Sequence, residues 1–292
     1  MNKVVIIVDS TCDLSKELVE KNDVQIVPLT VNFPDETYYD GVDITTPQLC
    51  KMVSEKGILP KTAAITLGEI YNVFEKWIDA GYDIIYTGIS SQMSKSYENA
   101  VMMSKEFADG RIEVVDSANL STGIALLVLK ACKWRDEGKD VHEIARLMRE
   151  MVPHVRSQFI VDTMEYLHKG GRCSSVAKLF GTILKIKPLI AVREGKMSVA
   201  GKPRGKIEAC LDKLVEMVIE DKENIDPEMV FITHSEADSS CAYLMEKVKE
   251  VLPEANVVEA KAGCIISTHC GPGTIGLIIS PKVNNKNLKE FL

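Results

Sequence analysis

The chain has 292 residues, and at roughly 150 residues per domain this length predicts two domains. Its hydrophobic share of 46 % and charged share of 26 % are ordinary for a globular protein, which excludes disordered and collagen-like classes. The net charge of −7 argues against a nucleic-acid partner, because phosphate backbones attract basic surfaces. The longest apolar run, residues 123–129, is far shorter than the ~18 residues that span a bilayer, so we expect no stable membrane insertion.

The predicted elements alternate between strands and helices along the chain. Short apolar, β-branched runs predict strands at residues 4–8, 24–31, 83–89, 113–116, 158–161, 188–192, 230–234, 256–260 and 274–280. Helical periodicity between them predicts helices at residues 46–56, 67–80, 94–108, 121–137, 141–152, 204–222 and 238–252. The first strand begins so early that we expect no secretory signal, and we place the protein in the cytoplasm with reduced cysteines.

This alternation predicts an α/β fold with two domains. Residues 1–153 read as a three-layer α/β/α domain with a mostly parallel sheet, because apolar strands followed by helices are typical of parallel sheets. Residues 154–292 read as a second α/β domain with a mixed sheet. The reason is a hairpin signal at residues 190–199 with Glu194 and Gly195 at its turn, since hairpin strands are antiparallel. Pro153 marks the boundary, because the preceding helix must end there.

Hydroxyl groups gather after the predicted strand at residues 83–89. Ligands in open α/β sheets bind beyond the carboxyl ends of strands, and a helix N-terminus with free N–H groups suits an anion. Ser91 or Ser94 alone would be explained as a helix cap, but four serines in this turn favour a ligand site. Thr62 is a second candidate, since Thr66 is the expected N-cap of the next helix and Thr62 has no such role; an ordinary polar loop is the alternative.

Two segments of the second half add candidates. Gly170 and Gly171 are typical of a helix end, and Arg172 directly after them either holds a carboxylate or forms a surface ion pair. His269 precedes a Gly-Pro-Gly turn and is as plausibly structural as functional. Cys270 is a weak nucleophile candidate, because no lysine or arginine lies near it in sequence to lower its pKa.

Several signatures are missing from the sequence. It contains no phosphate-binding G-x-x-x-x-G-K-[ST] loop, no G-x-G-x-x-G after a strand, no H-E-x-x-H and no C-x-x-C pair. The five histidines are scattered without metal-ligand spacing. We therefore expect no cofactor and no metal.

Seven segments in order along the chain resemble the DegV family of bacterial fatty-acid-binding proteins. They are VDSTCDL at 8–14, PKT at 60–62, GISSQMS at 88–94, VDS at 115–117, YLHKGGR at 166–172, IKPLI at 186–190 and HCGPG at 269–273. The resemblance implies two α/β domains with a long-chain fatty acid buried between them. It also implies a non-catalytic role as carrier subunit, which presents the carboxylate to a separate ATP-binding kinase subunit for acyl phosphate formation.

The resemblance further implies that Thr62 and Ser94 hold the carboxylate, with Ser91, Arg172 and His269 in the vicinity of the head group. Departures from the family pattern surround these positions: Ala63 and Ala64 replace Ser and Gln, and Lys95 replaces Gly. Lys95 either alters the opening or adds a cation near the acid. The competing interpretation is a stand-alone enzyme that acts on a small anionic substrate with His269 as its base.

Overall fold

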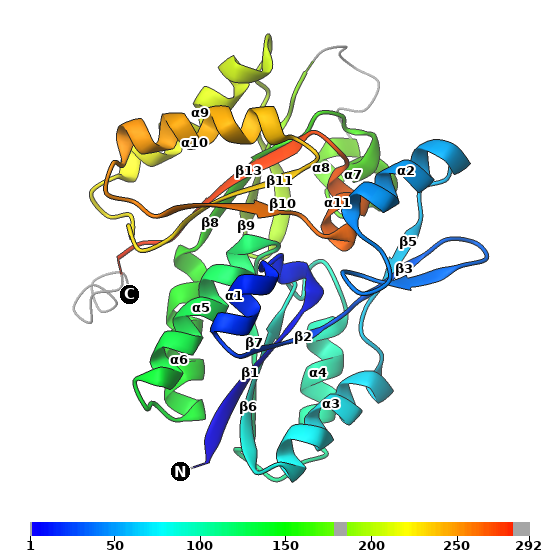
Figure 1. Ribbon diagram of the computed structural model, residues 1–292, viewed down its shortest axis with the longest axis vertical. Helices are drawn as coiled ribbons and strands as arrows, with labels where there is room; N and C mark the ends of the chain where they lie inside the picture. The colour runs from blue at the N-terminus through cyan, green and yellow to red at the C-terminus, as the bar shows by residue number, and fades with distance from the viewer. Residues whose placement is uncertain (1, 178–185, 283–292) are drawn as a thin grey trace.

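The computed structural model describes residues 2–177 and 186–282. Figure 1 shows two large sheets, one above the other, with a smaller sheet at their side. Both expectations for the sheets are confirmed, since the N-terminal sheet is parallel and the second sheet is mixed. The division into domains at residue 153 stays a prediction, and its second part includes residues 178–185 and 283–292, which lie outside the described chain.

The N-terminal sheet has four parallel strands in the order β2-β1-β6-β7. Its strands are β1 Lys3–Asp9, β2 Val24–Val27, β6 Tyr82–Gly88 and β7 Ile112–Asp116. Helices α3 Leu67–Asp79 and α4 Ser96–Ser104 cover one face, and α1 Lys16–Lys21, α5 Thr122–Asp136 and α6 Val141–Met151 cover the other. Side chains of β1 alternate between the two cores, Ile6 and Val8 on one side and Val5 and Ile7 on the other. This is the three-layer arrangement that the sequence predicts.

The single strand predicted at residues 24–31 is wrong. It divides into β2, which pairs with β1, and β3 Thr30–Asn32, which belongs to another sheet. Pro28 separates the two and has no N–H for a ladder. The next N–H, that of Leu29, donates to the Ser10 hydroxyl at 3.2 Å instead of to a strand.

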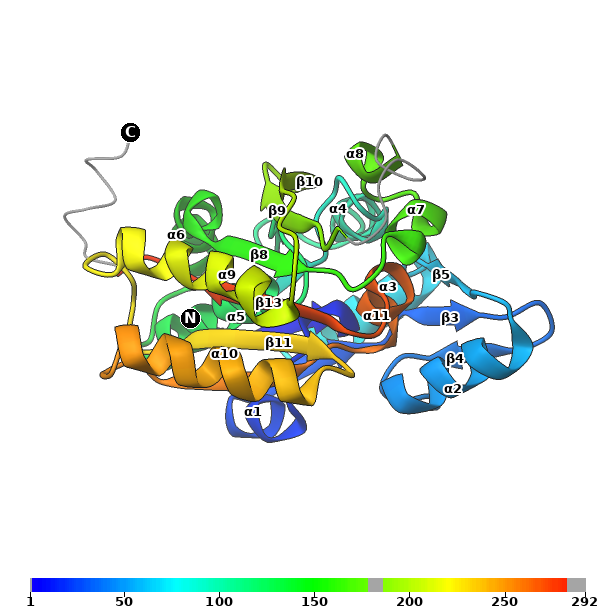
Figure 2. The same cartoon turned by 90° about the horizontal axis from the view of Figure 1, so that it is seen from above.

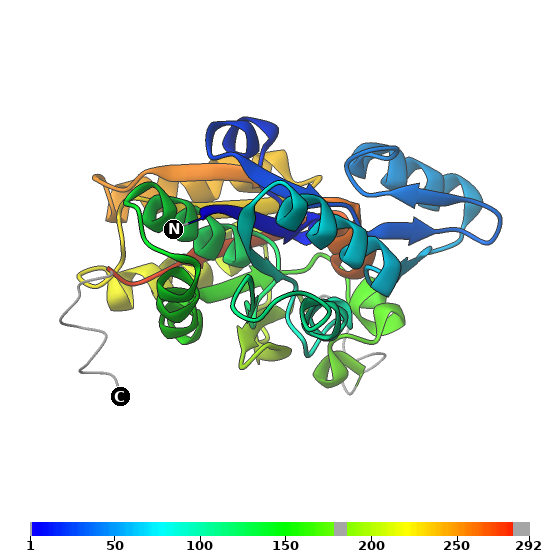
Figure 3. The same ribbon diagram turned by 90° about the horizontal axis from the view of Figure 1, so that it is seen from below.

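A three-stranded antiparallel sheet of order β4-β3-β5 projects beside the two large sheets (Figures 2 and 3). It contains β4 Thr37–Tyr39 and β5 Lys61–Ala63, joined by the connection that holds α2 Thr46–Lys56. The sequence predicted α2 with these bounds but neither of the two edge strands. Strands of three residues are too short to show an alternating pattern.

The C-terminal sheet has six strands in the order β10-β9-β8-β13-β11-β12. Among its strand pairs in the described chain, β11 and β12 are parallel and the other four pairs are antiparallel. Its strands are β8 Arg156–Ile160, β9 Leu189–Arg193, β10 Lys196–Gly201, β11 Val230–Ser235, β12 Val257–Lys261 and β13 Thr274–Ile279. Helices α9 Ile207–Asp221 and α10 Asp238–Val251 cover the outer face (Figure 1). The predicted hairpin is confirmed as β9 and β10, with Glu194 and Gly195 at positive φ in its turn.

Helix α5 lies between the two large sheets. Ten of its fifteen residues are buried, so both its faces are covered. Phe231 and Ile278 of the C-terminal sheet belong to the same apolar core as this helix. In the middle of this helix, Lys130 forms ion pairs with Asp226 at 2.6 Å and Glu228 at 2.7 Å. The helix therefore joins the two halves of the chain.

Short helices account for most of the remaining differences from prediction. The sequence predicted the helix before Gly170, which is α7 Glu165–Gly170, but not α1, α8 Ser174–Ala177 or α11 Cys264–Cys270. Two 3-10 turns, η1 Ser10–Cys12 and η2 Val152–His154, follow β1 and α6. Within residues 2–177 and 186–282, no helix combines the length and apolarity needed to cross a membrane.

Candidate functional site

A cavity of about 50 Å³ lies where the small sheet, the turn after β6 and α11 meet. Four of the five residues that the sequence predicted for a head-group site line it: Thr62, Ser94, Arg172 and His269. The other lining residues are almost all apolar: Leu29, Ala63, Ala64, Ile89, Met93, Leu120, Met197, Ile265, Ile266 and Cys270. The cavity thus has a polar group of side chains within an apolar wall.

Thr62 occupies the middle of edge strand β5, opposite Val31 of β3. Its side chain is half-buried, and its Oγ1 lies 2.8 Å from Nε2 of His269. The sequence left two interpretations of Thr62 open, a residue that binds the ligand or part of an ordinary polar loop. The structure places it in a strand instead, which fixes the direction of its hydroxyl toward α11.

His269 is carried near the end of α11, and its imidazole is mostly buried. Burial and the neighbouring Arg172 guanidinium lower the pKa of His269 to about 4. The ring is therefore neutral at neutral pH and serves as a hydrogen-bonding group rather than a cation. The sequence could not indicate this, because the depth of the side chain depends on how α7 packs on α11.

The two ring nitrogens of His269 have different surroundings. Nε2 faces Thr62, whereas Nδ1 is buried without a hydrogen-bond partner among the described residues. A Cβ on Gly170 would overlap Nδ1, so the glycine permits this close approach. Buried N–H groups without an acceptor are rarer than unpaired acceptors, and we therefore assign the proton to Nε2. Nε2–H then donates to Thr62, and the Thr62 hydroxyl keeps its own proton for a ligand.

Two buried aspartates fix the N-terminal end of α11. The Gly263 N–H donates to Asp13 at 2.8 Å, and the Cys264 N–H donates to Asp40 at 2.7 Å. Burial raises the pKa of both carboxyl groups. Sequence reasoning missed these residues, because each bond joins segments more than 200 positions apart in the chain. Their position explains how a seven-residue helix is held firmly enough to orient His269.

Ser94 lies in the turn between β6 and α4. The helix begins at Ser96, two residues after the predicted start. The Ser94 Oγ accepts from the Ser96 N–H at 3.3 Å and lies 3.1 Å from the Ser96 Oγ. The N-cap residue of α4 is Lys95, one position after Ser94. Ser94 therefore accepts from the first N–H of the helix without being its N-cap, and it also lines the cavity.

Ser91, three residues before Ser94, and Lys95, directly after it, do not line the cavity in the part of the chain that the structure describes. The Ser91 N–H donates to the Asp116 carboxylate at 3.1 Å. Lys95 is exposed, and its Nζ pairs with Glu98 at 2.7 Å. Lys95 is thus directed to its own helix rather than to the cavity.

Arg172 follows α7, which ends at Gly171 in the left-handed conformation with φ of 68°, as the Gly-Gly pair predicts. Its side chain is exposed at the cavity, and its Nη1 donates to the Gly170 carbonyl at 2.6 Å. Cys270 also lines the cavity, but burial raises the pKa of its thiol to about 12. Cys270 is therefore a packing residue and a poor nucleophile.

A second cavity of about 30 Å³ lies between the start of α5 and the C-terminal sheet. Leu120, Ile266 and Cys270 line both cavities, so these three side chains form the wall between them. The second cavity is bounded by Phe159 and Ile278 of the C-terminal sheet. The two cavities thus adjoin at these three side chains, and polar residues such as Thr233 and Ser235 also line the second one.

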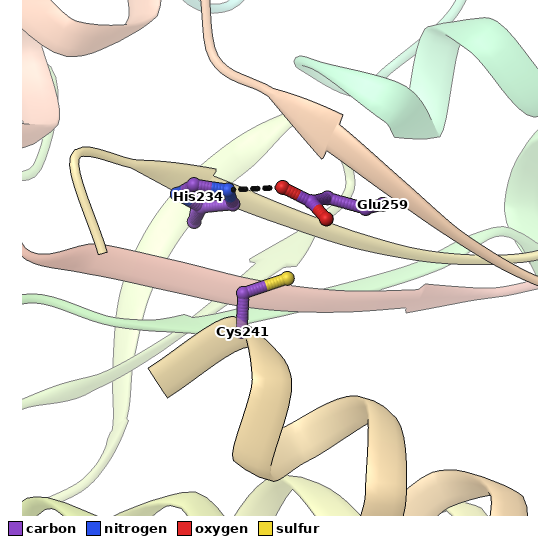
Figure 4. Close-up of side chains that lie close together, drawn as sticks. All are labelled: His234, Cys241 and Glu259. Carbon is purple, nitrogen blue, oxygen red and sulfur yellow. Dashed lines mark hydrogen bonds and ion pairs between the residues drawn. The ribbon is translucent and has the colours of Figure 1, made fainter. Parts of the chain in front are cut away.

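His234, Cys241 and Glu259 form a group with the donor types of a metal site (Figure 4). The His234 Nδ1 accepts a hydrogen bond from the Ala237 N–H at 3.1 Å. Its proton is therefore on Nε2, which donates to Glu259 at 3.0 Å. A metal would need the Nε2 lone pair and would put a proton on Nδ1, opposite the Ala237 N–H. The group fits a structural histidine rather than a metal ligand.

A family described as "Uncharacterised protein, DegV family" matches residues 3–282. The chain belongs to the DegV family. A DegV domain-containing protein of Clostridium acetobutylicum is 34 % identical over 282 residues, which cover 97 % of this chain and 100 % of that protein. Another from Clostridium perfringens is 33 % identical over 95 % of this chain and 98 % of its own.

Solved DegV structures share the fold over nearly the whole chain. One from Thermus thermophilus, described for its fatty acid binding, has a TM-score of 0.89 at 26 % identity and covers 96 % of this chain and 100 % of its own. A stearic-acid-binding protein from Eubacterium ventriosum has a TM-score of 0.85 at 28 % identity, with 97 % and 99 % covered. Fatty acid binding is therefore the property for which these two solved structures are described.

Proposed function

We propose that this DegV protein binds a long-chain fatty acid, with the carboxylate at Thr62 and Ser94 and the tail in the apolar cavities. The observation that carries the proposal is the joint lining of one cavity by Thr62, Ser94, His269 and Arg172 within an apolar wall. The description of the solved relatives as fatty-acid-binding proteins supports it.

The tail would supply most of the affinity. Each buried CH₂ contributes roughly 0.8 kcal/mol, whereas a hydrogen bond to a charged group contributes about 1.5–3 kcal/mol. A chain of about fifteen methylenes therefore outweighs the hydroxyl pair, whose role is to fix the position and direction of the acid.

The side chains around the cavities must move to admit the tail. The two cavities measure about 50 and 30 Å³, whereas ligand pockets usually measure roughly 300–1,000 Å³. Met93 and Met197 lie in the wall of the first cavity, and unbranched methionine side chains adapt readily to new shapes. Displacement of Leu120 and Ile266 would join the two cavities into one path.

The negative charge of the bound carboxylate would be balanced by Arg172, while the other polar groups at the head group stay uncharged. The Thr62 hydroxyl donates to one carboxylate oxygen, and the Ser94 hydroxyl donates to the acid as well. Arg172 lies at the cavity with a full positive charge, while His269 stays neutral because its pKa is lowered to about 4. His269 then acts through Thr62, whose hydroxyl it orients.

We also propose that the protein presents the bound acid to a separate ATP-binding kinase subunit. A carboxylate oxygen would attack the γ-phosphorus of ATP, the bond to ADP would break, and acyl phosphate would form. The exposed position of Arg172 at the cavity supports contact with a partner's phosphates. The sequence contains no phosphate-binding loop of its own, which supports a carrier without catalytic activity.

The competing stand-alone enzyme would use His269 as its base. A general base is most effective when its pKa lies near the working pH, and a pKa of about 4 makes His269 a weak one. Its Nε2 is moreover occupied by Thr62. The site therefore favours binding over proton abstraction.

Extraction of the purified protein and mass spectrometry of the extract test the binding proposal. We expect a long-chain fatty acid in near-stoichiometric amount, and addition of stearic acid to delipidated protein should restore the same occupancy. Absence of any lipid, together with no binding of added fatty acid, would overturn the proposal. Formation of acyl phosphate by the isolated chain with Mg-ATP would overturn the carrier role alone.

A further inference from the structure

The turn that carries Ser94 is organised by one buried residue, Ser90. Its carbonyl accepts from the Met93 N–H at 2.9 Å and from the Ser94 N–H at 3.1 Å. Its hydroxyl accepts from the Gln92 N–H at 3.2 Å. Ser90 therefore determines where the backbone of Ser94 lies, although it does not line the cavity in the described chain.

The same hydroxyl also reaches the C-terminal half of the chain. It donates to the carbonyl of Gly195, at the tip of the β9–β10 hairpin, at 2.9 Å. An N-terminal turn and a C-terminal hairpin thus meet through one hydroxyl group that is fully buried. The Ser90 hydroxyl has one proton, and it donates this proton to the Gly195 carbonyl. Loss of the hydroxyl would therefore leave this carbonyl without its donor.

Gly195 fits this contact for steric as well as conformational reasons. Its φ of 76° favours glycine, and an added Cβ would overlap the Ser90 Oγ and lie 3.1 Å from the Gln92 Cγ. The Ser90 hydroxyl cannot give way without breaking its bonds to Gln92 and Gly195. The hairpin also carries Met197, which lines the same cavity as Ser94.

We propose that the contact between Ser90 and the Gly195 hairpin tip is a positioning device that holds the Ser94 hydroxyl in register with Thr62. This inference rests on the proposed binding of a fatty acid. Ser90 is a positioning residue, since it acts through Ser94 and not on the ligand. Its effect should therefore fall on recognition of the carboxylate and not on burial of the tail.

The experiment compares affinities for stearic acid and its methyl ester in delipidated wild-type protein and in Ser90→Ala and Gly195→Ala. Gly138→Ala is the matched control, because Gly138 has a similar φ of 83° but nothing within 4 Å of an added Cβ. In both test variants we expect acid affinity to fall roughly tenfold, because one charge-assisted hydrogen bond loses its geometry. Ester affinity should stay unchanged, and the control should leave both affinities at the wild-type value.

The outcomes separate this inference from the proposed function. Parallel loss of acid and ester affinity would overturn the positioning role, because a merely structural contact would affect both ligands. Unchanged acid affinity in a folded Gly195→Ala protein would overturn it as well, even if Ser90→Ala failed to fold. Failure of the wild-type protein to bind either ligand would refute the proposed function, and this inference with it.

Discussion

Thr62 Oγ1 and His269 Nε2 lie 2.8 Å apart, although 207 residues separate them in the chain. The bond joins the edge strand of the small sheet to α11 and orients the Thr62 hydroxyl toward the cavity. Because His269 is neutral and donates from Nε2, Thr62 has its own proton available for a carboxylate.

Replacement of Thr62 by Val should therefore weaken acid binding and also lower the stability by about 1–3 kcal/mol, because the His269 Nε2–H loses its acceptor. Valine keeps the β-branched shape that an edge strand favours but removes the hydroxyl. Loss of a hydrogen bond to a charged group costs roughly 1.5–3 kcal/mol, which corresponds to a ten- to hundredfold loss of affinity. Fluorescence competition with a labelled fatty acid measures this loss of affinity. Thr37→Val, on the other edge strand of the same sheet, is the control and should leave binding unchanged.

Ser94→Ala should lower acid affinity by a similar factor. If Ser94 were only a helix cap, alanine would cost about 1 kcal/mol of stability and leave binding intact. The double variant with Thr62→Val should be less than additive, since both hydroxyls bind one group. Isothermal titration with stearic acid and urea unfolding of the same proteins separate the two effects.

Ser91→Ala is the control for this turn. Ser91 lies three residues before Ser94 but outside the cavity lining, and within the described residues its backbone N–H donates to Asp116. Affinity for stearic acid should therefore stay within twofold of the wild-type value, on the order of the ±0.5 kcal/mol typical of such substitutions. If Ser91→Ala lost binding and Ser94→Ala kept it, Ser91 and not Ser94 would hold the acid.

Stability should depend on pH through His269. Its pKa is lowered from 6.5 to about 4 by burial, so the unfolded chain takes up a proton at a higher pH than the folded protein does. The contribution of neutral His269 to the free energy of unfolding is fully present above pH 6.5. It is lost as the pH falls from about 6.5 to about 4, by up to roughly 3 kcal/mol. Urea unfolding at pH 7.5 and pH 4.5 should show a smaller loss of stability in His269→Gln than in the wild type.

The carboxyl group of Asp9 changes the stability with pH in the opposite direction to His269. For this reason His269→Gln is compared with the wild type and not judged alone. Burial raises the pKa of Asp9 to about 6, so its carboxyl group favours the folded state as the pH falls toward 4. This contribution is the same in both proteins and cancels in the difference. An equal pH dependence in wild type and His269→Gln would contradict the lowered pKa of the histidine.

Reaction of the native protein with a thiol reagent should modify one cysteine out of eight. Seven cysteines are buried, and Cys50 alone is half-exposed. Burial also raises the pKa of the Cys270 thiol to about 12, which removes the reactive thiolate. Absorbance after addition of Ellman's reagent should report one fast thiol, absent in Cys50→Ser, and all eight in urea. Fast labelling of Cys270, read by peptide mass spectrometry, would contradict its burial.

The sequence by itself determined the elements that are long enough to carry a periodic pattern. Helices such as α2 and α10 and strands such as β1 and β11 were predicted within a few residues. Their alternation predicted the parallel sheet, and the hairpin signal at residues 190–199 predicted the mixed one. Turn chemistry is equally local, so the Glu194–Gly195 hairpin turn and the helix end at Gly171 could be read from the residues themselves.

Only the tertiary structure decided which side chains meet. Strand β5 has three residues and α11 has seven, too few for a pattern that would reveal them or the direction of Thr62 and His269. Burial depends on packing between segments distant in the chain, so neither the neutral state of His269 nor the anchoring of α11 by Asp13 could be predicted. The resemblance named the hydroxyl pair, but the Ser90–Gly195 contact that positions Ser94 arises only where the two halves pack together.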